Sequence, residues 1–309
     1  MAKVIVIVGP TASGKSALAI YLAKKLGAEI ISADSRQVYR GMDIGTGKVT
    51  KTEQKQIKHW LIDIVSPKTN FSAAQFKKLA DKKIEDILKL GKLPIIVGGT
   101  GFWIKAVIDN VEFPKVKPDW KLRKKLDRKS ADALFTMLQN LDLDRAAEID
   151  QFNKVRLIRA IEIAKTLGKV PKMKMGSKYN TLQLGVSWPK EILSQRIKIR
   201  LDKRFKQGMI KEVAQLHNQG ISWQRLDNFG LEYRWIARYL RGKMPLKEMK
   251  EKLFQEIKNY AKRQMTWFNK DKRICWQVGE NEVEKLIKKF LVLLFAFYFL
   301  PSNFLFFWS

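Results

Sequence analysis

The sequence predicts an α/β protein, a doubly wound parallel sheet that carries a helical insertion domain. Three observations lead to this fold class. Residues 3–26 have the pattern of a buried strand, a glycine-rich loop and an amphipathic helix. Strand-like and helix-like runs then alternate as far as residue 112, as in a parallel sheet with crossover helices. From residue 122 to residue 167 the apolar residues recur at helical spacing throughout.

The first element is an apolar, β-branched run at residues 3–8, typical of a buried parallel strand. The loop after it fits the phosphate-binding pattern G-x-x-x-x-G-K-[ST] and consists of Gly9, Pro10, Thr11, Ala12, Ser13, Gly14, Lys15 and Ser16. Its glycines let backbone N–H groups turn inward and cradle phosphates at a helix start. We expect Lys15 to reach the terminal phosphates and the Ser16 hydroxyl to bind Mg²⁺. Pattern and context indicate a P-loop NTPase-like sheet, and an incidental glycine-rich turn is the alternative.

Three further strands are predicted at residues 29–33, at residues 59–67 and within the run LPIIVGG at residues 93–99. An amphipathic helix separates the last two, with Ser72 as its candidate N-cap and Gly91 as its terminator. Ligands of such sheets bind at the carboxyl ends of the strands, and Gly9, Asp34 and Gly98 all fall there.

The pattern changes after residue 112, where a charged linker with two prolines begins. A strand-like run at residues 182–188 returns the chain to the sheet, helices resume from residue 190 to about residue 267, and RICWQV is a candidate edge strand. The predicted organisation is a catalytic core at residues 1–112 and 182–285, a helical insertion at residues 113–181, and an apolar tail at residues 286–309.

The tail contains the wholly apolar run FLVLLFAFYFL at residues 290–300. This run is too short to span a bilayer, and Pro301 interrupts it. A packed terminal segment, an out-of-frame translation artefact and a membrane-surface anchor are the three interpretations left open.

The formal charge of +30 comes from 60 basic and 30 acidic residues. Residues 151–200 hold 12 Lys or Arg and only 2 Asp or Glu, whereas residues 101–150 hold 10 and 9. A polyanionic partner such as nucleic acid would use this field. A lysine-rich genome is the alternative explanation for part of the excess.

Cysteine and histidine are scarce, with Cys275, His59 and His217 as the full set. One cysteine allows no internal disulfide and no thiol metal cluster, and two histidines make His-based metal sites and triads improbable. The chain begins directly with a strand pattern and without a signal peptide. These features favour a cytoplasmic protein.

Asp34 is the acidic residue at a strand end, across the crevice from the phosphate loop. A carboxylate there can accept a proton from an incoming nucleophile. A small-molecule kinase could use it in this way, and so could a transferase that moves a group off a pyrophosphate. The alternative is that Asp34 only caps a turn.

Several longer motifs resemble the tRNA dimethylallyltransferase family, which transfers isopentenyl-type groups to tRNA. They include GPTASGKSALA, SADSRQVYRGMDIGTGK, GGTGFWIKA, QRIKIRLDKRFKQGMIKEV and YAKRQMTWF, and the resemblance covers nearly all of residues 3–268. It implies that dimethylallyl diphosphate is the donor. The acceptor is then N6 of the adenine 3′ of the anticodon in tRNAs reading codons that begin with U, and the products are N6-dimethylallyl adenosine and pyrophosphate.

The resemblance also implies roles for individual residues. Asp34 is the base for the adenine amine, Thr100 lies near the reacting centre and the tRNA, and Lys15 and Arg200 stabilise the leaving pyrophosphate. From spacing alone, Thr100 is a helix N-cap and Arg200 a solvated charge. The implied tRNA-binding residues are Asp34, Ser35, Arg36, Gln37, Thr100, Arg123, Arg156 and Arg159. The insertion would hold the anticodon stem-loop, and the target base would be flipped out of that loop. We expect a monomer with no obligate protein partner.

One departure from the family pattern lies at Leu231, where the family often has tyrosine. An RNA contact is then absent, or Tyr233 supplies it instead.

Two rival functions remain. An ATP-dependent small-molecule kinase explains the phosphate loop but not the basic second half, and a non-enzymatic RNA-binding protein explains the charge but not Lys15, Ser16 and Asp34 together.

Overall fold

The computed structural model describes residues 1–276 and 280–292. It divides the chain into two compact units, one made of Met1–Asp109 with Ser177–Ser309 and the other of Asn110–Gly176. The smaller unit is helical and is interposed in the sequence of the larger one. The α/β class predicted from the sequence is confirmed.

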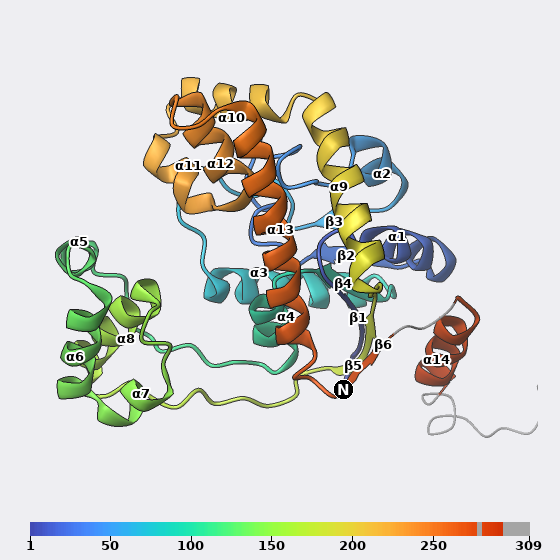
Figure 1. The fold of residues 1–309 in the computed structure, drawn as a ribbon. Helices are drawn as coiled ribbons and strands as arrows, with labels where there is room; N and C mark the ends of the chain where they lie inside the picture. Colours follow the sequence, from blue (N-terminus) through green and yellow to red (C-terminus); the bar gives the residue numbers. More distant parts are fainter. Residues whose placement is uncertain (277–279, 293–309) are drawn as a thin grey trace, which may run out of the picture. The chain divides into compact units, whose positions relative to one another are not determined.

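The larger unit is built on a parallel sheet of six strands in the order β3-β2-β4-β1-β5-β6 (Figure 1). The strands are β1 (Lys3–Val8), β2 (Glu29–Ser32), β3 (His59–Trp60), β4 (Pro94–Gly98), β5 (Asn180–Gly185) and β6 (Ile274–Trp276). The predicted returning strand and the predicted edge strand are therefore β5 and β6. Because all strands run the same way, their carboxyl ends share one edge, where a ligand of such a sheet binds.

The prediction of a strand over residues 59–67 is wrong beyond Trp60. Leu61 and Asp63 have φ of 63° and 56°, a left-handed conformation that a strand cannot contain. Beyond this point an isolated bridge between Tyr39 and Val65 and a few backbone hydrogen bonds join the two segments. Apolar composition suggested the longer strand, and the backbone turns at these two positions end it.

The helices of the larger unit are α1 (Lys15–Leu26), α2 (Lys51–Gln56), α3 (Ala73–Lys89), α4 (Gly101–Ile108), α9 (Lys190–Lys206), α10 (Met209–Asn218), α11 (Trp223–Phe229), α12 (Leu231–Leu240), α13 (Leu246–Phe268) and α14 (Glu280–Val292). The predicted N-cap of α3 is confirmed, since the Ser72 side chain accepts from the Gln75 N–H in a capping box. None of the helices in residues 1–276 and 280–292 is both long and apolar enough to cross a membrane.

Both faces of the sheet are covered, because β1 sends alternate side chains to opposite sides. Val4, Val6 and Val8 join the core formed with α3, α4 and the α9–α13 helices. Ile5 and Ile7 join a second core, which α1 and α14 complete. The first part of the predicted apolar tail thus belongs to α14, while residues 293–309 lie outside the described residues.

The smaller unit consists of α5 (Trp120–Asp127), α6 (Ala131–Leu141), α7 (Leu143–Glu148) and α8 (Lys154–Leu167). It has its own hydrophobic core, in which Leu126 of α5, Leu134 and Leu138 of α6, and Leu157 and Ile161 of α8 are buried. Each helix hides an apolar stripe against the others, which accounts for the helical periodicity of this segment.

Candidate active site

A cavity of about 890 Å³ lies at the carboxyl ends of the strands in the larger unit. The phosphate loop, the turn after β2, the end of β4 and the helices α9 and α13 all contribute to its lining. The sequence-predicted residues that line it are Thr11, Ala12, Gly14, Lys15, Ser16, Asp34, Arg36, Gln37 and Arg200. The others from these loops, Gly9, Pro10, Ser13, Ser35 and Thr100, are not among its lining residues. One cavity thus brings the phosphate loop and Asp34 together.

The phosphate loop has the backbone that its glycines allow. Gly14 has φ of 102°, which favours glycine, and it precedes the first residue of α1. A side chain at Gly9 would lie 2.3 Å from the Val186 carbonyl oxygen, so only glycine fits there. Lys15 reaches back and donates to the Pro10 carbonyl oxygen at 3.1 Å. Burial, and after it the charge of Arg200, lower the pKa of Lys15 to about 8.

Three side chains outside the loop hold its backbone in place. The Thr11 N–H donates to Gln264 Oε1 at 2.9 Å. Arg196 Nε donates to the Ala12 carbonyl oxygen at 2.9 Å, and Trp188 Nε1 donates to the Ser13 carbonyl oxygen at 2.7 Å. The loop is therefore braced from α9, α13 and the segment before α9.

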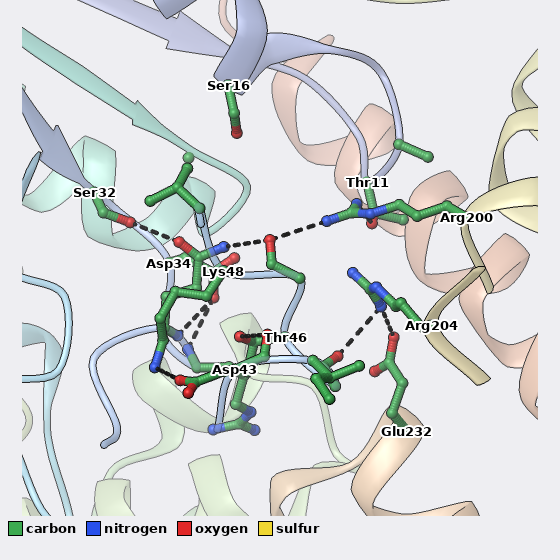
Figure 2. Close-up of a pocket in the computed structure, with 18 of the residues that line it drawn as sticks. Thr11, Ser16, Ser32, Asp34, Asp43, Thr46, Lys48, Arg200, Arg204 and Glu232 are labelled. Carbon is green, nitrogen blue, oxygen red and sulfur yellow. Dashed lines mark hydrogen bonds and ion pairs between the residues drawn. The ribbon is translucent and has the colours of Figure 1, made fainter. Parts of the chain in front are cut away.

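Arg200 and Arg204 extend from one face of α9 into the site (Figure 2). Arg200 donates to Thr11 Oγ1 and to the Gly47 carbonyl oxygen, each at 3.2 Å. Arg204 is buried and pairs with Glu232 at 2.7 Å. Burial, followed by the charge of Arg204, lowers the pKa of Arg200 to about 10. Arg200 therefore stays charged near neutral pH beside the phosphate loop.

Asp34 sits in a tight turn directly after β2. Its Oδ1 accepts from the Arg36 N–H at 2.8 Å and from the Gln37 N–H at 3.4 Å. Asp34 does cap a turn, as the alternative interpretation supposed. The turn also fixes the carboxyl group at the edge of the cavity, so capping and proton transfer are compatible roles.

Thr100 begins α4, but its hydroxyl does not cap that helix. Instead, Thr100 Oγ1 accepts from the Ser35 N–H at 3.0 Å, so it ties the Asp34 turn to the loop after β4. Thr100 is the N-cap residue of α4, as spacing alone predicted, although its hydroxyl makes no capping hydrogen bond to that helix.

The side chains of Arg36 and Gln37, which follow Asp34 in the chain, both have partners within the protein. Gln37 accepts from Ser32 Oγ at 3.2 Å and donates to the Gly47 carbonyl oxygen at 3.4 Å. Burial lowers the pKa of Arg36, whose guanidinium lies over the ring of Phe229. These contacts orient both side chains along the wall of the cavity.

The loop that supplies Gly47 is held by a buried carboxylate. Glu212 accepts from the N–H groups of Asp43, Ile44 and Gly45 and from the Tyr233 hydroxyl. Tyr233 lines the cavity but is only 2% exposed, and its replacement of the family tyrosine as an RNA contact stays a prediction. Leu231 does line the cavity, with φ of 44°.

In the smaller unit, two of the three predicted tRNA-binding arginines share one acidic partner. Glu162 is 1% exposed and accepts from Arg123 Nε at 2.8 Å, from Arg123 Nη2 at 2.6 Å, and from Arg159. Burial alone would raise the pKa of Glu162, but these hydrogen bonds outweigh it and hold the pKa below its ordinary value. Arg156 is exposed, and within the described residues no hydrogen bond or ion pair of its guanidinium is found.

Sequence reasoning assigned Arg200 but missed Arg196, Arg204, Glu212 and Gln264. Three of the arginines of α9 recur every four residues, which places them on one helix face and was the available signal. Gln264 offered no such signal, because its two partners are distant in sequence.

Most of this chain, the site residues included, is similar to known proteins. The sequence pattern of the family described as IPP transferase matches residues 37–271. The chain belongs to this IPP transferase family. A tRNA dimethylallyltransferase of Acetivibrio thermocellus is 43% identical over 302 residues, covering 93% of this chain and 96% of the relative. One of Leuconostoc mesenteroides is 41% identical over 283 residues, covering 91% and 95%.

Solved structures of the IPP transferase type agree with this assignment. The full-length tRNA isopentenylpyrophosphate transferase from Bacillus halodurans is 36% identical, with a TM-score of 0.70, and the match covers 95% of this chain and 96% of that one. A eukaryotic dimethylallyltransferase, described as acting on tRNA, gives a TM-score of 0.81 at 26% identity over 98% of this chain and 82% of its own. The family resemblance inferred from the motifs is confirmed.

Proposed function

We propose that the chain transfers a dimethylallyl group from dimethylallyl diphosphate to N6 of the adenine 3′ of the anticodon, in tRNAs reading codons that begin with U. The observation that carries the proposal is a single cavity lined by a phosphate loop and by Asp34. Membership of the IPP transferase family and the names of the relatives support it. The products are N6-dimethylallyl adenosine and pyrophosphate.

The phosphate loop and Arg200 would stabilise the pyrophosphate as it leaves. The backbone N–H groups at the start of α1 would hold the diphosphate, and Lys15 and Arg200 would stabilise the charge that develops as the C–O bond breaks. Arg200 is suited to this role because its guanidinium is already directed at Thr11 of the loop. The allylic carbon can carry positive charge, so much of the barrier lies in this departure.

The Ser16 hydroxyl would hold Mg²⁺ beside the diphosphate, where the ion would offset negative charge. The fit rests on the position of Ser16, which lines the cavity at the first turn of α1 (Figure 2). No group of three or more acidic, His or Cys residues suited to a metal occurs in the described part of the chain. The other ligands would be phosphate oxygens and water, which Mg²⁺ prefers.

The turn that carries Asp34 would activate the nucleophile, the adenine amine. An aromatic exocyclic amine is a weak nucleophile, and Asp34 would take its proton as the C–N bond forms. Thr100 would keep the turn in place through Ser35. Tyr260 also lines the cavity, and burial together with the charge of Asp34 raises its pKa, so its phenol stays neutral beside the carboxylate.

The tRNA would present its adenine flipped out of the anticodon loop. Ser35, Arg36 and Gln37 would meet that base and its neighbours, while Arg123, Arg156 and Arg159 of the insertion would contact the anticodon stem-loop. The net charge of +30 suits a polyanionic substrate. We further infer that the protein acts as a cytoplasmic monomer without an obligate protein partner.

The decisive experiment supplies the purified protein with tRNA and with either allyl-labelled dimethylallyl diphosphate or γ-labelled ATP. Label should move from the allylic donor to tRNA and appear at N6 of adenine after digestion. Phosphoryl transfer from ATP to a small molecule, with no consumption of the allylic donor, would establish the kinase instead. Binding of tRNA without any transfer would indicate an RNA-binding protein.

A further inference from the structure

Gln264 joins two loops of the active site through one buried side chain. Its Oε1 accepts from the Thr11 N–H, and its Nε2 donates to the Gly99 carbonyl oxygen, each at 2.9 Å. Because the Thr11 N–H can only donate and the Gly99 carbonyl can only accept, the orientation of the amide is fixed. The residue is 7% exposed, so water does not compete readily for either bond.

The two loops belong to the two halves of the proposed reaction. Thr11 lies in the phosphate loop, and its hydroxyl accepts from Arg200. Gly99 directly precedes Thr100, whose hydroxyl accepts from the Ser35 N–H beside Asp34. A continuous chain of bonded groups thus runs from the diphosphate site through Gln264 to the turn that carries the base.

The fit around Gln264 is tight. A Cβ atom added at Gly99 would lie 2.3 Å from Gln264 Nε2, so the amide fills the space next to that backbone. A side chain at Gly99 would therefore displace the amide that joins the two loops.

We propose that Gln264 is a positioning residue that sets the separation between the phosphate loop and the Asp34 turn, and with it the alignment of donor carbon and adenine amine. This inference rests on the proposed transfer reaction. Two reactants held in a near-attack arrangement gain much of their rate from alignment, and a misplacement of about 1 Å can cost about 100-fold.

The test compares Gln264→Met with Gln255→Met. The first change keeps the length of the side chain and removes both hydrogen bonds. The second alters an exposed glutamine of the same helix, whose amide donates to Asn259 Oδ1 at 3.1 Å and lies away from the site. In single-turnover transfer the first variant should be slower by about 100-fold, with dissociation constants for donor and tRNA within about threefold of the parent. The second variant should match the parent.

Gly99→Ala perturbs the same junction without removing Gln264 or any other polar group. Its backbone is not in the left-handed region, so alanine introduces crowding and not backbone strain. We expect a similar loss of rate, and the double variant should be little slower than the slower single variant, since both changes act on one junction. Thermal unfolding of each variant shows whether the assayed protein is folded.

A Gln264→Met rate within a few-fold of the parent would overturn the inference. A loss confined to donor affinity would also overturn it, because Gln264 would then serve the phosphate loop alone. If Gln264→Met fails to fold, Gly99→Ala decides by the same two criteria. An inactive parent protein would reject the proposed function itself, which separates that failure from failure of the positioning role.

Discussion

The phosphate loop and the arginines of the insertion use charge in opposite ways. In the loop, neutral groups and Arg196 bind the backbone from outside, and Lys15 lines the cavity while it donates to the Pro10 carbonyl oxygen of the same loop. In the insertion, Arg123 and Arg159 are occupied by the buried carboxylate of Glu162. A lysine or arginine that the family resemblance assigns to binding can thus line the active site or stabilise the fold. Its hydrogen-bond and ion-pair partners distinguish the two roles.

This difference predicts different consequences of substitution. Changes in the loop should remove activity from a protein that remains folded. Changes at Arg123 and Arg159 should loosen the insertion in addition to weakening its proposed contact with tRNA. Arg156, which is exposed, is the arginine of the three whose loss should affect RNA alone.

Lys15→Met carries the largest expected effect in this comparison. Removing a charge that stabilises the leaving pyrophosphate should slow transfer by about 10²–10³-fold at saturating donor. The matched control is Lys24→Met, an exposed lysine on the same helix. Full activity of the Lys15 variant at saturating donor would remove the phosphate-loop assignment.

The lowered pKa of Lys15 predicts how donor binding depends on pH. Above a pKa of about 8 the free site loses its ammonium charge, so the dissociation constant for the donor should rise, by about fivefold between pH 8 and pH 9. Calorimetry at both pH values measures this, and Lys15→Met should flatten the profile.

The lowered pKa of Lys15 affects the stability of the fold in the opposite sense. Between about 8 and the ordinary value of 10.5 the unfolded chain binds more protons, so the ligand-free protein gains stability as pH rises.

Arg123→Met and Arg159→Met should destabilise the protein. Each leaves the buried carboxylate of Glu162 short of a donor, and the free energy of unfolding should fall by about 1–3 kcal/mol. Arg156→Met should change it by less than about 0.5 kcal/mol. Urea unfolding measures all three. Equal stability in the three variants would show that the pairing with Glu162 contributes nothing.

The smallest effect concerns the salt dependence of tRNA binding. Affinity of the parent should fall steeply with salt, because lysine and arginine contacts release counterions from RNA. Arg156→Met should reduce the slope by roughly 0.7–0.9 if this residue neutralises one phosphate. A flat response of the parent between low and physiological salt would separate the +30 charge from RNA binding.

The sequence predicted the parts of the site that depend on local pattern. The strand–loop–helix at β1 and α1, the acidic residue after β2 and the Ser72 cap are each specified by a few consecutive residues. The rest depends on contacts between distant segments. The pairing of Gln264 with Thr11 and Gly99, and the burial of Tyr233 against Glu212, leave no periodic trace in the chain. The strand at residue 59 was predicted, but its early end at Trp60 was not, because the positive φ angles fall on Leu61 and Asp63 and not on glycine.

The central claim is that Asp34 takes the proton of the adenine amine in the cavity that holds the diphosphate. Asp34→Asn tests it most directly, because asparagine keeps the oxygen that accepts from the Arg36 N–H and so preserves the turn. We predict that donor and tRNA still bind and that single-turnover transfer slows by about 10²–10⁴-fold. A transfer rate within a few-fold of the parent would contradict the role of Asp34 as the base and leave it as a turn cap.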